Sequence, residues 1–100
     1  MRVRWTPEAL DQLRAIHEHI SHESPAVARQ VIQRLVARGG QLAELPRSGR
    51  KVPDYGRDDL REVLVRPYRI VYRITPLQID VVTVMHYRQL LPRDWQQLGA

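Results

Sequence analysis

The sequence contains no cysteine, and Lys51 is its only lysine. The absence of cysteine excludes disulfides and thiol nucleophiles and is typical of the reducing cytoplasm. No run of about 18 apolar residues is present, which argues against a membrane-spanning helix, and the first residues lack the apolar stretch of a signal peptide. The glycine-rich motifs of nucleotide-binding proteins and the nucleophile motif of hydrolases are also missing. We therefore expect a cytoplasmic protein that contacts no membrane and carries no cofactor.

The length and composition predict one globular domain. At 100 residues the chain has room for a single domain, and we assign residues 1–100 to it. A composition of 43% hydrophobic and 27% charged residues is typical of a globular protein and argues against a disordered tail or a fibrous repeat. No internal repeat or low-complexity tract interrupts the chain, so we expect one continuous fold.

The positive charge is concentrated in the central third of the chain. The formal net charge is +5, and residues 46–73 alone have a net charge of +4. All but one of the basic side chains are arginines, whose planar guanidinium binds carboxylates or phosphates through two parallel hydrogen bonds. Such a region attracts an acidic partner or a phosphate backbone. The alternative is a solvated surface that keeps the protein soluble.

Two capping signals predict an antiparallel pair of helices near the N-terminus. Residues 2–5 alternate like a short strand, and Thr6-Pro7-Glu8 then has an N-cap, a first-turn proline and an acidic first turn. The apolar spacing that follows predicts a helix that ends near residues 21–23. Ser24-Pro25 repeats the start signal at once, and so short a link makes the two helices antiparallel neighbours.

The second helix contains a pair of glycines near its end. We expect this helix to continue through Gly39-Gly40 to about Leu45, although glycine is unfavourable inside a helix. The glycine pair either ends the helix or permits a close approach of another segment. Residues 46–59, rich in proline and glycine, follow as a loop with almost nothing to bury.

The last third of the chain predicts an antiparallel meander. Within residues 68–74, Tyr68, Ile70, Tyr72 and Ile74 share one face, so we interpret both tyrosines as core residues rather than as platforms for stacking bases. The fold class is α+β, a helical hairpin packed on a small antiparallel sheet in the order β-α-α-β-β-β. The expected strands are residues 60–65, 68–74 and 79–87, followed by a short C-terminal helix within residues 92–98.

Three histidines near the end of the first helix are candidate metal ligands. A zinc pair on a helix needs two histidines four residues apart on one face, and Ser21 stands four residues after His17. His19 and His22 share a face, but no third ligand is evident. We therefore expect no metal site, and we interpret His17 as a half-buried core residue at the edge of the apolar stripe.

The strands also carry charged and titratable side chains. Arg61, Arg69 and Arg73 are expected to converge on one sheet face, and His86-Tyr87-Arg88 ends the last strand. Phosphodiester cleavage needs a proton-transfer group and cations for the phosphate, which His86 and the arginines could provide. The alternative is that the arginines cover an open sheet face and bind a protein partner.

Five strings in the right order resemble the RelE/ParE superfamily of bacterial type II toxins. The resemblance covers residues 2 to about 93, and no single string decides it. The strings are Trp5-Thr6-Pro7-Glu8-Ala9, Leu45-Pro46-Arg47-Ser48-Gly49-Arg50, Leu60-Arg61-Glu62-Val63, Pro67-Tyr68-Arg69-Ile70-Val71-Tyr72-Arg73-Ile74 and Val82-Thr83-Val84-Met85-His86-Tyr87-Arg88.

The resemblance implies one of two toxic activities that cause growth arrest. RelE-like members cut messenger RNA on the ribosome, whereas ParE-like members, the plasmid-stabilisation branch, poison DNA gyrase. The single lysine departs from the RelE pattern, so the resemblance favours a ParE-like gyrase inhibitor without catalytic residues. If the chain is instead a nuclease, its catalytic residues are His86, Tyr87, Arg61 and Arg69. A third reading is an inactive relative with a regulatory role.

The resemblance also implies partners. A cognate antitoxin is expected to cover the toxin with an acidic or amphipathic C-terminal segment, and operator DNA is reached only indirectly through that antitoxin. Trp95, in the C-terminal tail, is interpreted either as part of a target-binding element or as a residue packed on the sheet. The residues expected to bind the antitoxin or the target are Arg50, Lys51, Arg61, Arg69, Arg73, His86, Arg88 and Trp95.

Overall fold

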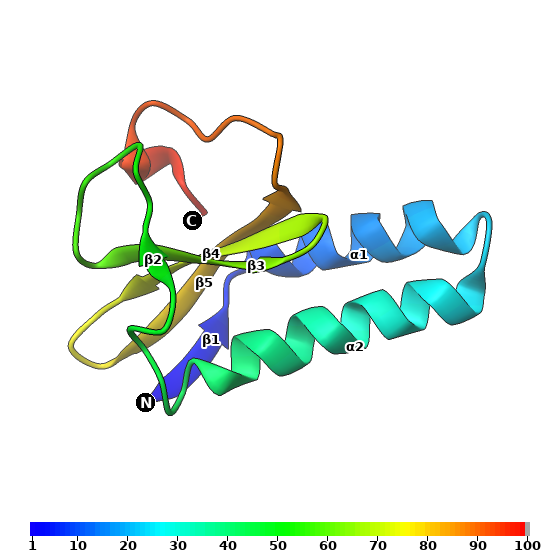
Figure 1. The fold of residues 1–100 in the computed structure, drawn as a ribbon, viewed down its shortest axis with the longest axis horizontal. Helices are drawn as coiled ribbons and strands as arrows, with labels where there is room; N and C mark the ends of the chain where they lie inside the picture. The colour runs from blue at the N-terminus through cyan, green and yellow to red at the C-terminus, as the bar shows by residue number, and fades with distance from the viewer. Residues whose placement is uncertain (100) are drawn as a thin grey trace.

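A computed structural model describes residues 1–99 and confirms the α+β order predicted from the sequence. No helix within this range is long and apolar enough to cross a membrane. Figure 1 shows the helical hairpin extending well past one end of the sheet. The elements are β1 (Arg2–Trp5), α1 (Pro7–Ser21), α2 (Pro25–Gln41), β2 (Arg50–Lys51), β3 (Leu60–Val65), β4 (Tyr68–Ile74), β5 (Gln78–His86) and the one-turn 3-10 helix η1 (Trp95–Gln97).

Both helices begin where the capping signals predict. The Thr6 side chain accepts a hydrogen bond from the Ala9 N–H at 3.2 Å, and the Ser24 side chain accepts one from the Val27 N–H at 3.2 Å. Each cap is followed by a proline in the first turn, where its missing N–H leaves no bond unmade. The two helix starts are therefore encoded locally.

The second helix is shorter than expected. It ends at Gln41 rather than near Leu45, so that prediction is wrong at its C-terminal end. The N–H of Leu42 bonds to the carbonyl of Gly39 at 3.2 Å, a tighter turn than that of an α-helix. Pro46 further disfavours helical backbone at the residue before it. Leu42 is nevertheless fully buried, because the turn still points its side chain into the core.

The glycine pair in α2 has two different roles. Gly39 is buried, and a Cβ placed on it would lie 2.4 Å from the indole ring of Trp5. Gly40 is exposed, and a Cβ there would meet nothing within 4 Å. The helix continues through both residues, so Gly39 provides the close approach that lets β1 pack against α2, whereas Gly40 has no contact that requires glycine.

The sheet is mixed rather than purely antiparallel. Its strand order is β1-β5-β4-β3-β2, and the meander of β3, β4 and β5 is antiparallel as predicted. β1 instead pairs in parallel with β5, with Val3 opposite Ile79. Capping and periodicity carry no information about which strand a short N-terminal segment will join, so the sequence did not predict this pairing.

The segment 46–59 buries more than a loop was expected to bury. It contains β2, which pairs with β3, and Val52 directly after it is fully buried. The Tyr55 hydroxyl donates a hydrogen bond to the carbonyl of Pro92 at 2.6 Å and so joins this segment to the C-terminal tail. The expectation of a loop with nothing to bury is therefore wrong, because its few apolar residues form part of a second core.

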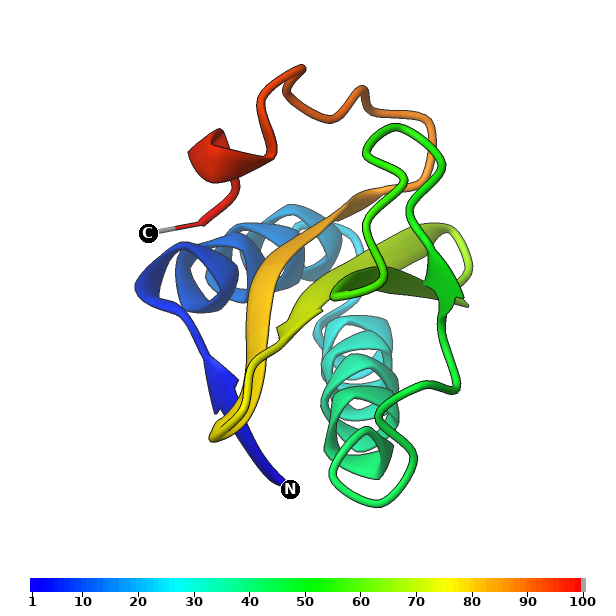
Figure 2. The same ribbon diagram turned by 90° about the vertical axis from the view of Figure 1, so that its left-hand side faces the viewer.

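Two apolar cores lie on opposite faces of the sheet. The larger one, between the sheet and the hairpin, includes Leu13, Leu35, Ile70 and Tyr72, which confirms the predicted core face of β4. The smaller core lies under the C-terminal segment, which Figure 2 shows on the far side of the strands from α2. The C-terminal tail therefore packs on the face that the helices leave open. The members of the smaller core are Val52, Leu60, Val71, Val82, Leu91 and Leu98.

The three histidines at the C-terminal end of α1 and directly after it lie outside both cores. His17, His19 and His22 are exposed, so the interpretation of His17 as a half-buried residue is wrong. The stripe of α1 that packs on the sheet is narrower than the sequence suggested, and His17 falls beyond its edge. Among residues 1–99 no group of three His, Asp or Glu side chains is placed to hold a metal ion.

The glycine pair gives a matched test of this packing. Gly39→Ala should lower the free energy of unfolding by about 1–3 kcal/mol, because the new methyl group overlaps the Trp5 ring. Gly40→Ala should raise it by up to about 1 kcal/mol, because alanine favours helix and meets no neighbour. Urea unfolding of both variants measures the two changes. Changes of the same sign in the two variants would contradict the assignment.

Candidate partner-binding surface

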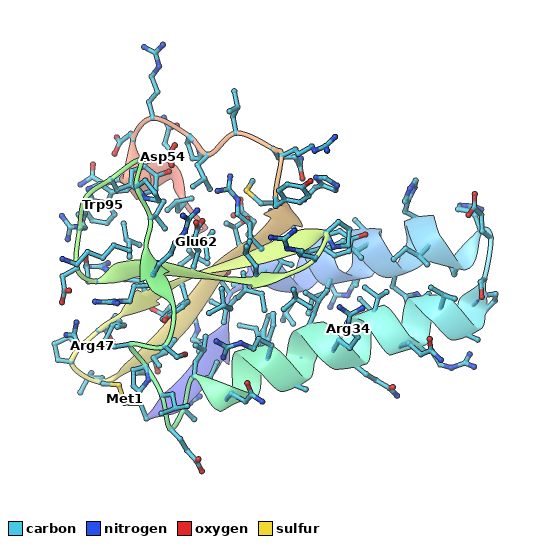
Figure 3. The ribbon with its side chains drawn as sticks, in the orientation of Figure 1. Met1, Arg34, Arg47, Asp54, Glu62 and Trp95 are labelled. Atoms are coloured by element: carbon cyan, nitrogen blue, oxygen red, sulfur yellow. The ribbon has the colours of Figure 1, made fainter. Side chains whose placement is uncertain are left out.

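A buried carboxylate lies on the face of the sheet that the helices do not cover. The Glu62 side chain has no exposed area, and both of its oxygens are bound by arginines. Arg50 of β2 approaches Oε2 at 2.6 Å, and Arg69 of β4 donates to Oε1 at 3.1 Å. Figure 3 shows Glu62 at this position on β3. One acidic side chain thus joins three neighbouring strands.

This pairing is a consequence of strand register. Arg50 lies directly opposite Glu62, and Arg69 is diagonal to it across β4. A buried carboxylate is tolerated only when it is paired and hydrogen-bonded, and here two guanidinium groups satisfy it. Sequence analysis missed Glu62. The only signal in the sequence was its spacing of two residues from Leu60 and from Leu64, which places the glutamate on the same strand face as two apolar residues.

Arg61 lies on the other face of the sheet. It is opposite Tyr72 and shares the helix-covered face with it, so the expectation that Arg61, Arg69 and Arg73 converge on one face is wrong. Its guanidinium donates to the carbonyl of Gly49 at 2.9 Å and binds the Asp58 carboxylate at 2.8 Å. Only 12% of the side chain is exposed. Arg61 therefore holds the two ends of the 49–58 segment together.

Tyr72 and Gly49 form a second anchor for that segment. The Tyr72 hydroxyl donates to the carbonyl of Pro46 at 2.6 Å and accepts the N–H of Gly49 at 3.0 Å. Burial raises the pKa of the Tyr72 phenol above its ordinary value. A Cβ at Gly49 would lie 2.6 Å from the carbonyl oxygen of Glu62, so only glycine fits at this crossing.

Two neighbouring aspartates form ion pairs with most of the remaining basic side chains of the central third. Asp58 pairs with Arg47, Lys51 and Arg61, and the hydrogen bond from Arg47 is the largest cause of its lowered pKa. Asp59 pairs with Arg57 and Arg73. The hydrogen bond from Arg57 is the main cause that holds the pKa of Asp59 below its usual range. Basic residues expected to face a partner, such as Lys51 and Arg73, are therefore already paired within the chain.

Trp95 packs on the sheet. Its half-buried ring joins the smaller core. The guanidinium of Arg57 lies 4.1 Å from the ring centroid, and that of Arg73 lies 5.1 Å from it. Of the two interpretations given above, packing on the sheet is therefore the one that the structure supports.

His86, Tyr87 and Arg88 form a small stack at the end of β5. The rings of His86 and Tyr87 are stacked with centroids 5.0 Å apart, and Arg88 lies over Tyr87 at 5.5 Å. His86 also meets the edge of Tyr68 at 6.2 Å. Its Nδ1 accepts the backbone N–H of Arg88 at 3.1 Å, which places the proton of the neutral imidazole on Nε2.

Three arginines without an ion pair lie on or beside α2. Within residues 1–99, no carboxylate forms an ion pair with Arg34, Arg38 or Arg66. Arg34 and Arg38 are one helical turn apart on α2, and Arg34 reaches the carbonyl of Arg66 at 3.5 Å. Together with Arg50, which is 67% exposed, they form a basic strip along α2 and the outer edge of β3. Figure 3 marks Arg34 on α2.

Sequence analysis missed Arg34 and Arg38 because they lie outside the basic central third. Residues 1–45 are almost neutral, so a charge count by segment gave these arginines no weight. The available signal was their spacing of four residues, which places both on one helix face. Of the residues expected to bind a partner, the structure brings only Arg50 into this strip.

The architecture defines the fold class, a helical hairpin packed on a five-stranded mixed sheet. A solved structure described as the chromosomal ParDE TA system from P. aeruginosa has this fold, with a TM-score of 0.72 and 24% sequence identity. The match covers 86% of this chain and 95% of that one.

Sequence comparison identifies the family within this class. The family described as the ParE toxin of the type II toxin-antitoxin system parDE matches residues 3–91, and the chain belongs to it. The protein Toxin RelE2 of Caulobacter vibrioides is 36% identical over 90 residues, which cover 89% of this chain and 98% of that protein. The resemblance seen in the sequence is thus confirmed at the level of the superfamily, and an antitoxin partner follows from it.

The role of Glu62 can be tested by removing its charge. Glu62→Gln leaves the guanidinium of Arg69, which is only 11% exposed, without its counterion, and should lower the free energy of unfolding by about 3 kcal/mol. The control is Asp11→Asn, which breaks the exposed pair with Arg14 and should change stability little. Urea unfolding measures both variants, and an equal effect would contradict the role of burial.

Asp59 predicts a dependence of stability on pH. Its pKa in the folded state is lowered, so its carboxylate stabilises the fold above the unfolded value of about 3.9. That stabilisation is lost as the pH falls through the lower folded-state pKa. The difference in unfolding free energy between the wild type and Asp59→Asn should therefore be largest above pH 5 and should shrink below about pH 4. A difference that stays constant down to pH 2 would contradict the pairing with Arg57.

Proposed function

We propose that this protein is the toxin of a type II pair, acts by binding and poisoning DNA gyrase, and is neutralised by a cognate antitoxin. Membership of the ParE toxin family supports the toxin role and the antitoxin partner. The choice of gyrase over messenger RNA rests on one observation: the side chains that a nuclease would need are separated in the fold. Such a target places the protein in the bacterial cytoplasm.

The separation follows from register and alternation. His86 lies opposite Tyr68 on β4, whereas Arg61 lies opposite Tyr72, about 13 Å further along the strand. Arg69 is on the other face, bound to Glu62. Cleavage of a phosphodiester needs a proton-transfer group and phosphate-binding cations within hydrogen-bond reach of one substrate. This arrangement offers no single place where His86, Arg61 and Arg69 meet a phosphate.

The hydrogen bond at His86 also argues against a general base. In the neutral imidazole, Nε2 carries the proton and Nδ1 has the free electron pair. That pair is already occupied by the N–H of Arg88. To accept a proton from a substrate hydroxyl, His86 would have to release this bond. We therefore assign His86 a structural role in the turn that follows β5.

A ribosome-dependent endoribonuclease is the second candidate. The stack of His86 with Tyr87 favours it, because some ribosome-dependent members of the superfamily carry a similar pair. The relative in Caulobacter vibrioides carries a name from that branch. Under either activity, we expect contact with operator DNA to be indirect, through the antitoxin.

The two mechanisms differ in what a substitution at His86 does. His86→Gln cannot transfer a proton, and a nuclease that uses His86 should lose about 10²- to 10⁴-fold in activity. We expect His86→Gln to remain as toxic as the wild type when expression is titrated in growing cells. Pulse labelling should show that DNA synthesis falls before protein synthesis.

The matched control is His17→Gln, at an exposed histidine on α1. Binding to the co-expressed antitoxin confirms that each variant is folded. Loss of toxicity in folded His86→Gln but not in His17→Gln, together with cut messenger RNA in wild-type cells, would overturn the gyrase proposal. Normal growth of cells that express abundant wild-type protein would favour the inactive relative.

A further inference from the structure

The basic strip borders a helix face that carries no acidic side chain. The 17 residues of α2 include no aspartate or glutamate, whereas the surface of a soluble domain ordinarily mixes both signs of charge. α2 runs along one outer edge of the molecule (Figure 1), and three glutamines and two small residues line its solvent face. All five of these residues are exposed, namely Gln30, Gln33, Ala37, Gly40 and Gln41. No carboxylate on this helix therefore weakens the attraction of an anionic partner.

The arginines of the strip are largely without counterions. Arg34 and Arg38 are exposed, form no ion pair within residues 1–99, and lie about 6 Å apart along the helix axis. Arg66 is likewise exposed, and Arg34 reaches its carbonyl. Arg50 contacts Glu62 but exposes 67% of its side chain. The strip thus concentrates positive charge on one side of the molecule.

A cleft separates Arg38 from Arg50. It has a volume of about 370 Å³, and Ser48 and Glu62 also line it. Both carboxylate oxygens of Glu62 are already bound by arginines. Arg38 donates to the neutral groups of Gln41 and Ser48, each at 3.3 Å, and the Ser48 hydroxyl donates to no acceptor within the described residues. Two guanidinium groups and a free hydroxyl donor around one cleft suit a phosphate group.

The side chains of this surface fit the backbone of a nucleic acid duplex. Arginine and glutamine are among the residues that bind phosphates in protein–DNA interfaces, and arginine does so through two parallel hydrogen bonds. Duplex DNA carries about one negative charge per 1.7 Å of its axis, so several arginines on one helix can meet phosphates together. Single strands are instead bound by aromatic rings on which bases stack. No aromatic residue belongs to the strip or lines the cleft.

We propose that the basic strip binds the phosphate backbone of duplex DNA, independently of its sequence, with one phosphate in the cleft between Arg38 and Arg50. Phosphate contacts carry no sequence information, so recognition of an operator is left to the antitoxin. The inference goes beyond the proposed function and does not rest on it, because DNA binding is measured without gyrase or antitoxin. For a toxin that acts on gyrase, which holds a DNA duplex, the strip adds a second contact on the same assembly.

The dependence of binding on salt counts the phosphate contacts. The probe is a fluorescent duplex of about 20 base pairs, titrated with the full-length protein at about 50 to 200 mM salt and followed by anisotropy. Four arginines that each displace one counterion give a slope of log K against log salt concentration of about −3 to −4. Two duplexes of unrelated sequence should bind with the same affinity and the same slope.

Substitutions in the strip are compared with one on another face of α2. Arg34→Gln and Arg38→Gln should each reduce the magnitude of the slope by about 1 and should weaken binding to both duplexes equally. Arg29→Gln is the matched control, because it removes the same charge from an exposed arginine about 140° around the helix from Arg34 and about 180° from Arg38. We expect it to keep the wild-type slope. Thermal unfolding checks the fold of each variant.

Three outcomes would overturn this inference. Absence of binding at the lowest salt would overturn it and leave the toxin role and its target intact. An equal loss of slope in Arg29→Gln and Arg38→Gln would show that net charge alone attracts DNA. Tighter binding of a single-stranded RNA than of the duplex would assign the strip to RNA instead.

Two further measurements separate the strip from other partners and from the proposed function. Arg38→Gln that loses affinity for the antitoxin but keeps the wild-type slope with DNA would assign the strip to the antitoxin and overturn the inference. Binding of DNA through the strip in a protein that leaves DNA synthesis unchanged in cells would support the inference and overturn the proposed action on gyrase.

Discussion

The buried Glu62 carboxylate, held between Arg50 and Arg69, is the interaction on which the open half of this structure depends. β2 has only two residues, too few to be stable by backbone pairing alone, and the ion pair to Arg50 fixes it to β3. The same carboxylate draws Arg69 across the sheet, where it also binds the carbonyl of Gln89 in the tail. Strands β2, β3 and β4 and the C-terminal segment thus meet at one charged group.

Because of these ion pairs, most of the basic residues in the central third of the chain have a structural role. Most basic residues of the central third hold the 46–59 segment and the tail in place through Asp58, Asp59 and Glu62. A count of charges along the chain cannot distinguish these paired arginines from free ones. Within residues 1–99, arginines without an ion pair lie on α2, after β3 and after β5, for example Arg34, Arg66 and Arg88.

The arginines on the strands are divided between the two faces of the sheet. Arg61 belongs to the helix-covered face, and Arg69 and Arg73 belong to the face under the tail. A surface that binds partners tolerates such a division, because each contact acts by itself. Catalysis does not, because the reacting groups must reach one substrate. The division of these arginines between the two faces therefore supports the proposed binding function.

The sequence by itself determined the local features of this protein. The caps at Thr6 and Ser24, the apolar stripes of the helices and the alternation of β4 follow from interactions within a few residues, and each was predicted. The tertiary structure alone decided the parallel pairing of β1, the burial of Glu62 and the second core under the C-terminal tail. These depend on contacts between segments far apart in the chain, which neither periodicity nor composition records.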